Sequence, residues 1–216
     1  MRDFVYSQSE ARGCGMKRIL LIFLCILIAS AFFIGGFFAL LFGSYERVET
    51  DIAKYSDHLH GIGSAERMMP ALDSLGNYAS LEYSYKVHCY STFVGFFSDG
   101  YALCVTYDES QYEHRKTEAL TSYAYLQEPA IAEDGDYLLP VTELDYKGFT
   151  LKIVPDEDQF TYCPCKSFMM IGFNDTEYKI LYLYYYDFDI DYIAAADEDP
   201  VDEMTELIED AFAWIE

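Results

Sequence analysis

The feature that most constrains this chain is a run of 24 residues, Ile19 to Phe42, without a single charged side chain. At about 1.5 Å per residue, a helix of this length spans roughly 36 Å, enough to cross a hydrocarbon core about 30 Å thick. A cleaved signal peptide has an apolar region of only about 7–15 residues. The run also continues through Phe32-Phe33-Ile34, past an Ala29-Ser30-Ala31 pattern that resembles a cleavage site. Residues 19–42 are therefore predicted to form an uncleaved transmembrane anchor.

Basic residues flank the anchor on its N-terminal side, namely Arg12, Lys17 and Arg18. On the other side, Arg47 and Lys54 are interspersed with acidic residues. Cytoplasmic flanks of membrane helices carry an excess of Lys and Arg. We therefore expect residues 1–18 to be a short basic cytoplasmic segment, and the chain beyond the anchor to lie outside the cell as part of a single-pass membrane protein.

The rest of the chain is strongly acidic. The whole sequence carries a formal net charge of −23, and the part after residue 18 holds 10 basic and 35 acidic residues, a formal charge of −25. Nucleic acid is excluded as a partner because its binding requires clustered Lys and Arg. An anionic lipid surface repels such a domain as well, so the domain is expected to stand off the bilayer.

Residues 45–61 are predicted to form a juxtamembrane amphipathic helix. Their apolar residues recur at spacings of 3, 4, 3 and 4, and Gly61 ends the pattern. These residues are Tyr45, Val48, Ile52, Tyr55 and Leu59. Packing against the domain is the expected use of this face. A coiled-coil homodimer is the alternative, although two heptads are fewer than the three or four that define such a pattern.

Residues 62–216 are predicted to form an extracytoplasmic α+β domain. Stretches rich in Tyr, Phe and Val predict strands, at residues 81–97, 101–107, 149–154, 168–173 and 178–191. Asp99-Gly100 and Asn174-Asp175 predict hairpin turns between them. Asp108 and Asp199 are expected to cap two helices. Hairpins with helices between and after them predict one antiparallel sheet with helices packed on one face.

Four cysteines follow the anchor, and in an extracytoplasmic domain they predict up to two disulfides. They are Cys89, Cys104, Cys163 and Cys165. A hairpin centred on Asp99-Gly100 would separate Cys89 from Cys104 by about 20 Å, well beyond the limit of about 7 Å between the Cα atoms of a disulfide. Bonds from the 163–165 loop to a strand are therefore favoured. Free thiols, or a redox or metal role for Cys163-Pro164-Cys165, are the alternatives.

The acidic end of the last aromatic strand is the candidate metal site. Asp187, Asp189, Asp191 and Glu198 occupy positions 1, 3, 5 and 12 of a calcium loop of the EF-hand type. Position 6 is Tyr192 rather than the required Gly, and a predicted strand precedes the loop. The alternation of Asp with apolar residues in a half-exposed strand explains the pattern equally well. Calcium is the one cofactor that the sequence suggests.

No motif identifies a reaction. A zinc site at His58-x-His60 would need a third ligand, because residues two apart do not share a helical face. No Ser or Cys nucleophile is recognisably paired with a His, and no phosphate-binding loop is present. We therefore expect a non-catalytic module that binds or senses a protein or envelope component. The alternatives are a membrane-tethered hydrolase using paired carboxylates and a structural subunit of a membrane complex.

Overall fold

The computed structural model describes residues 21–38, 43–91, 96–156 and 166–213, and it divides into two compact units. The first unit contains an apolar helix, Leu21–Phe38, which is long and apolar enough to cross a membrane. The predicted apolar helix is thus confirmed over these residues, and the remaining ends of the predicted anchor lie outside the described residues. The second unit contains residues 44–90 and 95–216 and holds the described strands, except for Ser91, the last residue of β2.

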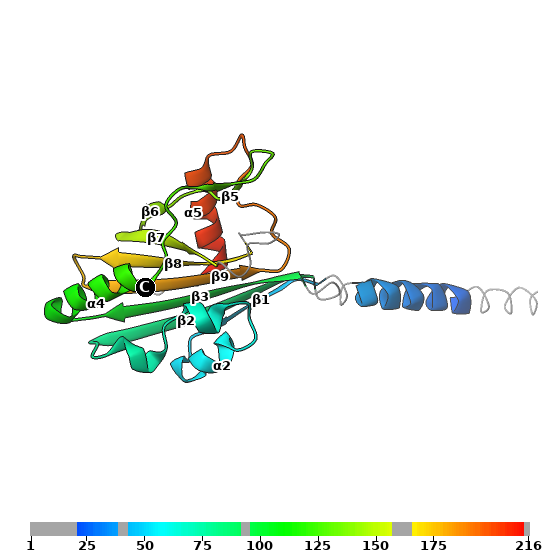
Figure 1. Cartoon of the computed structure of the whole chain (residues 1–216). Coiled ribbons are helices and arrows are strands. Elements are labelled where there is room, and N and C mark those ends of the chain that lie inside the picture. Colours follow the sequence, from blue (N-terminus) through cyan, green and yellow to red (C-terminus); the bar gives the residue numbers. More distant parts are fainter. Residues whose placement is uncertain (1–20, 39–42, 92–95, 157–165, 214–216) are drawn as a thin grey trace, which may run out of the picture. The chain divides into compact units, whose positions relative to one another are not determined.

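Seven antiparallel strands form the main sheet of the second unit, in the order β1-β2-β3-β9-β8-β7-β6 (Figure 1). Their bounds are β1 Tyr45–Glu49, β2 Ser80–Ser91, β3 Phe96–Thr106, β6 Glu143–Tyr146, β7 Phe149–Pro155, β8 Ser167–Asn174 and β9 Lys179–Asp187. A separate two-stranded sheet contains β4, Ala130–Ile131, and β5, Tyr137–Leu139. The predicted α+β class with an antiparallel sheet is confirmed.

The sheet carries a hydrophobic core on each of its faces. Along β9, Ile180, Tyr182 and Tyr184 belong to one core, and the intervening Leu181, Leu183 and Tyr185 belong to the other. This alternation follows from the two-residue period of a strand. Because the central strands are apolar on both sides, both faces of the sheet require a cover.

Helices accordingly pack on both faces, which differs from the expected packing on one face. The first core includes residues of α2 (Tyr55–Leu59), α3 (Ala65–Met68), the 3-10 helix η2 (Leu72–Leu75) and α4 (Glu109–Ser122). The second core includes residues of α5 (Pro200–Ala211) together with β5. Every residue of β8 is buried, so a single layer of helices would leave half of its side chains in water.

Helix α5 forms as its sequence predicts. The Asp199 side chain accepts hydrogen bonds from the N–H groups of Val201 and Asp202, and Pro200 occupies the first turn, where its missing N–H carries no penalty. Met204 and Ile208 are fully buried in the second core. Val201, in the first turn, is exposed.

The other predicted cap and one of the predicted hairpins are also confirmed. Asp108 caps α4 by accepting the N–H of Gln111 at 2.9 Å. The Asn174 side chain accepts the N–H groups of Thr176 and Glu177, which closes the turn between β8 and β9. In both places a short polar side chain binds local N–H groups, an arrangement that depends only on neighbouring residues.

The hairpin predicted at Asp99-Gly100 is wrong, because both residues lie inside strand β3. Gly100 pairs with Tyr185 of β9. A Cβ atom added to Gly100 would lie 2.0 Å from the carbonyl oxygen of Ala211, at the end of α5. Glycine is therefore present here for the close approach of helix to sheet rather than for a turn.

The helix predicted for residues 45–61 is replaced by three shorter elements. Residues Tyr45–Glu49 form β1, which pairs with β2, and they are followed by the 3-10 helix η1 (Ile52–Lys54) and by α2. Asp51 starts the helical part, since its side chain accepts the N–H of Ala53. Hydrogen bonds offered by the free edge of β2 outweigh the weak helical preference of the first five residues.

Substitution of Gly100 by Ala tests the close approach of α5. We expect Gly100→Ala to lower the free energy of unfolding by about 1–3 kcal/mol, because its Cβ must displace backbone atoms rather than a flexible side chain. Chemical denaturation of the full-length protein in detergent micelles measures this difference. Gly36→Ala is the control, since nothing lies within 4 Å of that Cβ position. Equal stability of the two variants would contradict the packing described.

Candidate binding pocket

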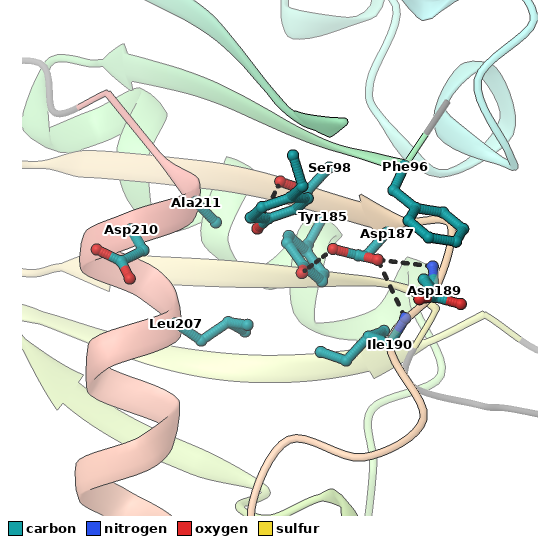
Figure 2. A pocket seen from close by; sticks show the side chains of 10 residues that line it. Phe96, Ser98, Tyr185, Asp187, Asp189, Ile190, Leu207, Asp210 and Ala211 are labelled. Carbon is teal, nitrogen blue, oxygen red and sulfur yellow. Dashed lines mark hydrogen bonds between the residues drawn. The ribbon is translucent and has the colours of Figure 1, made fainter. Parts of the chain in front are cut away.

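A pocket of about 380 Å³ lies where β9 ends, between the sheet and helix α5 (Figure 2). We call it the α5 pocket. Its lining contains three aromatic rings, three carboxylates and four smaller side chains. These residues are Tyr90, Phe96, Tyr185; Asp187, Asp189, Asp210; and Ser98, Ile190, Leu207 and Ala211. The pocket thus combines residues from β2, β3, β9, α5 and the segment that follows β9.

The sheet register accounts for the floor of the α5 pocket. Ser98 of β3 pairs with Asp187 of β9, and Gly100 pairs with Tyr185. Residues two apart on a strand share a face, so Tyr185 and Asp187 both lie on the α5 side. Tyr90 of β2 reaches the same side, where its hydroxyl lies 3.3 Å from the Ser98 hydroxyl. Three strands therefore contribute adjacent polar groups to one surface.

Asp187 is held firmly at the end of β9. Its Oδ2 accepts the hydroxyl of Tyr185 at 3.1 Å, and its Oδ1 accepts the N–H groups of Asp189 and Ile190 at 2.8 and 3.0 Å. The side chain is 7% exposed. These bonds fix the carboxylate and turn the chain away from the sheet, as Asp commonly does in turns.

The other two carboxylates, those of Asp189 and Asp210, are exposed, whereas Asp187 is buried. Figure 2 shows Asp210 on α5, at the opposite end of the view from Asp187, with its carboxylate turned away from it. Asp189 lies on the segment after β9, beside Phe96. Burial raises the pKa of Tyr90, and the charges of Asp187 and Asp210 act in the same direction. Tyr90 therefore remains a neutral phenol at neutral pH.

Two other hollows of the surface are less suited to a ligand. A hollow of about 180 Å³ lies between η2 and α4, and the Arg115 guanidinium there is bonded to Ser74 and Glu118. Another, of about 410 Å³, lies beside β1 and β2 and includes Val48 and Tyr83. Neither combines a fixed buried carboxylate with several aromatic rings, so the α5 pocket is the stronger candidate.

The four carboxylates predicted to bind calcium do not form a cluster. Within residues 21–38, 43–91, 96–156 and 166–213, no group of three or more His, Cys, Asp or Glu side chains is arranged to hold a metal ion. Asp187 and Asp189 line the α5 pocket, whereas Asp191 is exposed and Glu198 accepts the N–H of Ala195. The calcium prediction thus receives no support from the described residues.

The histidines of the His58-x-His60 pattern have separate partners. The Nδ1 atom of His58 lies 2.9 Å from the Tyr83 hydroxyl, and that of His60 lies 2.9 Å from a Glu66 carboxylate oxygen. Burial lowers the pKa of His58. The two imidazoles therefore do not converge on one ligand.

Cys89 and Cys104 are both buried and carry free thiols. Cys104 belongs to the core under α5, and Cys89 lies next to Tyr90, which reaches the α5 side, so Cys89 points to the opposite face. The two are therefore not placed to bond to each other. Burial raises the pKa of Cys104 to about 11, which makes it a poor nucleophile. The predicted partners Cys163 and Cys165 lie outside the described residues.

Asp99, which the sequence suggested only as a turn residue, is a buried carboxyl group. It is 1% exposed and lies on the face opposite the α5 pocket. Its Oδ1 accepts the Tyr85 hydroxyl at 2.6 Å, while Oδ2 has no hydrogen-bond partner among the residues that the structure describes. Burial raises the pKa of Asp99 to about 6; the Tyr85 hydrogen bond opposes this shift, and the charge of Asp187 adds to it.

Comparisons with protein-family models, with curated proteins and with solved structures find no match for this chain. The functional argument therefore rests on the residues and geometry described above.

The raised pKa of Asp99 predicts a pH-dependent stability. The pKa of Asp99 is about 6 in the folded state and about 3.9 in the unfolded state, so the folded state binds the proton more tightly. The stabilisation from this proton is complete below about pH 3.9 and is lost as the pH rises through about 6. Relative to Asp99→Asn, the wild type should lose up to about 3 kcal/mol of unfolding free energy between pH 4 and pH 8, since each pKa unit corresponds to about 1.4 kcal/mol.

Denaturant titrations of the full-length protein at several pH values measure this difference. The control is Asp73→Asn, which neutralises an exposed carboxylate and should follow the wild-type curve. Parallel curves for wild type and Asp99→Asn would show that Asp99 is not held in a desolvated site.

Proposed function

We propose that this protein is a single-pass membrane-anchored binding or sensing module, with its N-terminus in the cytoplasm and its acidic domain outside the cell. The apolar helix Leu21–Phe38 supports the anchor. The excess of basic residues before this helix supports the orientation. In this proposal the α5 pocket takes a small ligand, and the anchor keeps the binding site at the cell surface.

The observation that carries the proposal is the composition of the α5 pocket. Its volume of about 380 Å³ lies within the range of roughly 300–1,000 Å³ that is typical of small-molecule sites. Such sites are mostly apolar with a few fixed polar groups, which is the combination formed by the aromatic rings and the hydrogen-bonded carboxylate of Asp187. Strands and a helix supply these groups, so they are held in place before a ligand arrives.

The sheet register relates the pocket to the start of the domain. Tyr45, the first residue of the sheet, pairs with Cys89, which immediately precedes the pocket residue Tyr90. The pocket therefore lies at the end of the sheet where the chain enters the domain. In this proposal an envelope component supplies the ligand.

The hydrolase alternative has less support. A hydrolase with paired carboxylates needs two such groups directed at one reacting atom. Among the described residues of the α5 pocket, Asp187 is fixed at its own turn by three hydrogen bonds, and Asp210 points away from it (Figure 2). Binding rather than hydrolysis is therefore the function that this geometry favours.

Tags at the two ends of the full-length chain test the orientation. We expect an antibody to bind a C-terminal epitope tag on intact spheroplasts and to bind an N-terminal tag only after permeabilisation, because the basic flank is retained on the cytoplasmic side. Immunofluorescence of both tagged forms, before and after permeabilisation, measures the accessibility of each end of the chain. The reverse pattern of accessibility would refute the extracytoplasmic assignment.

A substitution that fills the pocket tests ligand binding. A fragment library is screened by ligand-observed NMR against the full-length protein in nanodiscs, and hits are retested on Leu207→Trp, whose larger ring should occupy the pocket that Leu207 lines. We expect the variant to lose at least tenfold in affinity for the hits. Val201→Trp is the matched control, since Val201 lies on the same helix but is exposed outside the pocket.

Both variants must melt near the wild-type temperature for the comparison to hold. A screen without hits, or hits that bind both Trp variants equally, would contradict the proposed function.

A further inference from the structure

We infer that the ligand of the α5 pocket is a small organic cation, an ammonium group carried on an apolar body. This inference rests on the proposed binding function and specifies its ligand class. Three properties of the pocket lead to it: the sign of its charges, the faces of its aromatic rings and the free capacity of one fixed carboxylate.

The charges that line the α5 pocket are all negative. Asp187, Asp189 and Asp210 contribute them, and no Lys, Arg or His is among its described lining residues. The chain beyond residue 18 carries a formal charge of −25, so the surrounding field has the same sign. Such a field attracts cations and repels anions. Phosphate and carboxylate ligands are therefore disfavoured.

Two basic residues that contact aromatic rings around the pocket are Lys166 and His88. The Lys166 ammonium lies 5.9 Å from the centre of the Phe188 ring, on the segment beside the pocket. The His88 ring stacks on Tyr90 at 4.2 Å between centroids. Neither residue lines the pocket. The Lys166–Phe188 contact shows that aromatic rings at this end of β9 already accept one cation.

The aromatic rings give the pocket its affinity for an organic cation. Tyr90, Phe96 and Tyr185 line it from three different strands. The face of an aromatic ring is negative, and a cation placed over it gains about 0.5–2 kcal/mol, more when it is shielded from water. Tyr90 is 50% exposed, so its ring is available to a ligand. The same rings cover the apolar body to which the ammonium is attached.

Asp187 provides the fixed counter-charge. A carboxylate can accept about four hydrogen bonds, and three are given by Tyr185, Asp189 and Ile190. Oδ2 holds only one of these three and belongs to a residue that lines the pocket. An ammonium N–H can therefore be added to a carboxylate that is already oriented, without the entropy cost of fixing a mobile side chain.

A bare metal ion fits these groups poorly. Calcium takes six to eight oxygen ligands, whereas the described residues contain no cluster of three or more metal-binding side chains. A pocket of about 380 Å³ with aromatic walls leaves room for carbon atoms around the charge. The charge is thus expected to belong to an organic molecule.

Three probes of nearly equal shape test the inference: 2-phenylethylamine, 2-phenylethanol and 3-phenylpropanoate. They carry a positive charge, no charge and a negative charge. With the full-length protein in nanodiscs, we expect calorimetry or ligand-observed NMR to show at least tenfold tighter binding of the amine than of the alcohol, and no binding of the carboxylate. A higher salt concentration should weaken the binding of the amine and leave the binding of the alcohol unchanged.

Two variants identify the groups responsible. Asp187→Asn keeps an oxygen that can accept the N–H groups of the turn, and it should reduce the preference for the amine at least fivefold. Tyr90→Leu removes a half-exposed ring and should reduce the affinity for the amine more than the affinity for the alcohol. Asp73→Asn, an exposed carboxylate that does not line the pocket, should leave both affinities unchanged.

The outcomes separate the ligand class from the binding function. Equal or tighter binding of the alcohol or the carboxylate would overturn the cation inference and leave the pocket as a binding site. The same holds if none of the three probes binds while fragment hits are lost on Leu207→Trp. If neither probes nor fragments bind, both the inference and the proposed function fail.

Discussion

The fold depends on the burial of strand β9 from both sides. β9 pairs with β3 along one edge and with β8 along the other, so its backbone is satisfied within the sheet. Its side chains alternate between two cores, and neither core is closed by the sheet alone. The helices that follow β1 and β3 cover one side, and α5, at the end of the chain, covers the other. The domain therefore cannot be completed until its last helix has docked.

The α5 pocket is a consequence of how that helix docks. At Gly100 the end of α5 approaches β3 so closely that even a methyl group has no room. Where β9 ends, Asp187 turns the chain away from the sheet and leaves space beside Leu207 and Asp210. Because α5 contacts the sheet tightly at Gly100 and the chain leaves the sheet at Asp187, a hollow with a rigid floor forms between them. The geometry of the pocket thus follows from Gly100 and Asp187, which belong to two residue pairs of the β3–β9 ladder that lie two positions apart.

The parts of the fold that could be predicted are those specified by neighbouring residues. Asp199 with Pro200 marks the start of α5, Asp108 marks the start of α4, and Asn174 closes the β8–β9 turn. Each depends on a side chain binding N–H groups two or three residues away. The apolar helix was equally clear, since only its length and lack of charge were needed.

The incorrect predictions concern residues whose structure is decided by distant partners. Asp99-Gly100 resembles a hairpin turn, but β2 and β9 extend β3 through it. The spacing from Tyr45 to Leu59 resembles a helix, yet the edge of β2 draws its first residues into a strand. The spacing of apolar residues indicates which face of an element is buried, but it does not indicate which strand pairs with that element.

The pocket shows the same division. Asp187 and Asp189 stood out in the sequence, but as members of a calcium loop, because their alternation was the only visible signal. Tyr90, Phe96 and Asp210 gave no signal, since they belong to β2, β3 and α5, which only the assembled sheet and its docked helix bring together. The aromatic composition of the strands indicated that the sheet would contain many rings. It did not indicate where in the fold these rings would cluster.

Strand β1 has a further consequence for how the domain opens. Four of its five residues are exposed, and among the described strands it pairs with β2 alone. Elements with few buried contacts open at a lower free-energy cost than the core does. None of the described core residues belongs to β1, so its detachment would leave both cores covered. The first strand of the domain can thus separate from β2 while the α5 pocket stays closed by its helix.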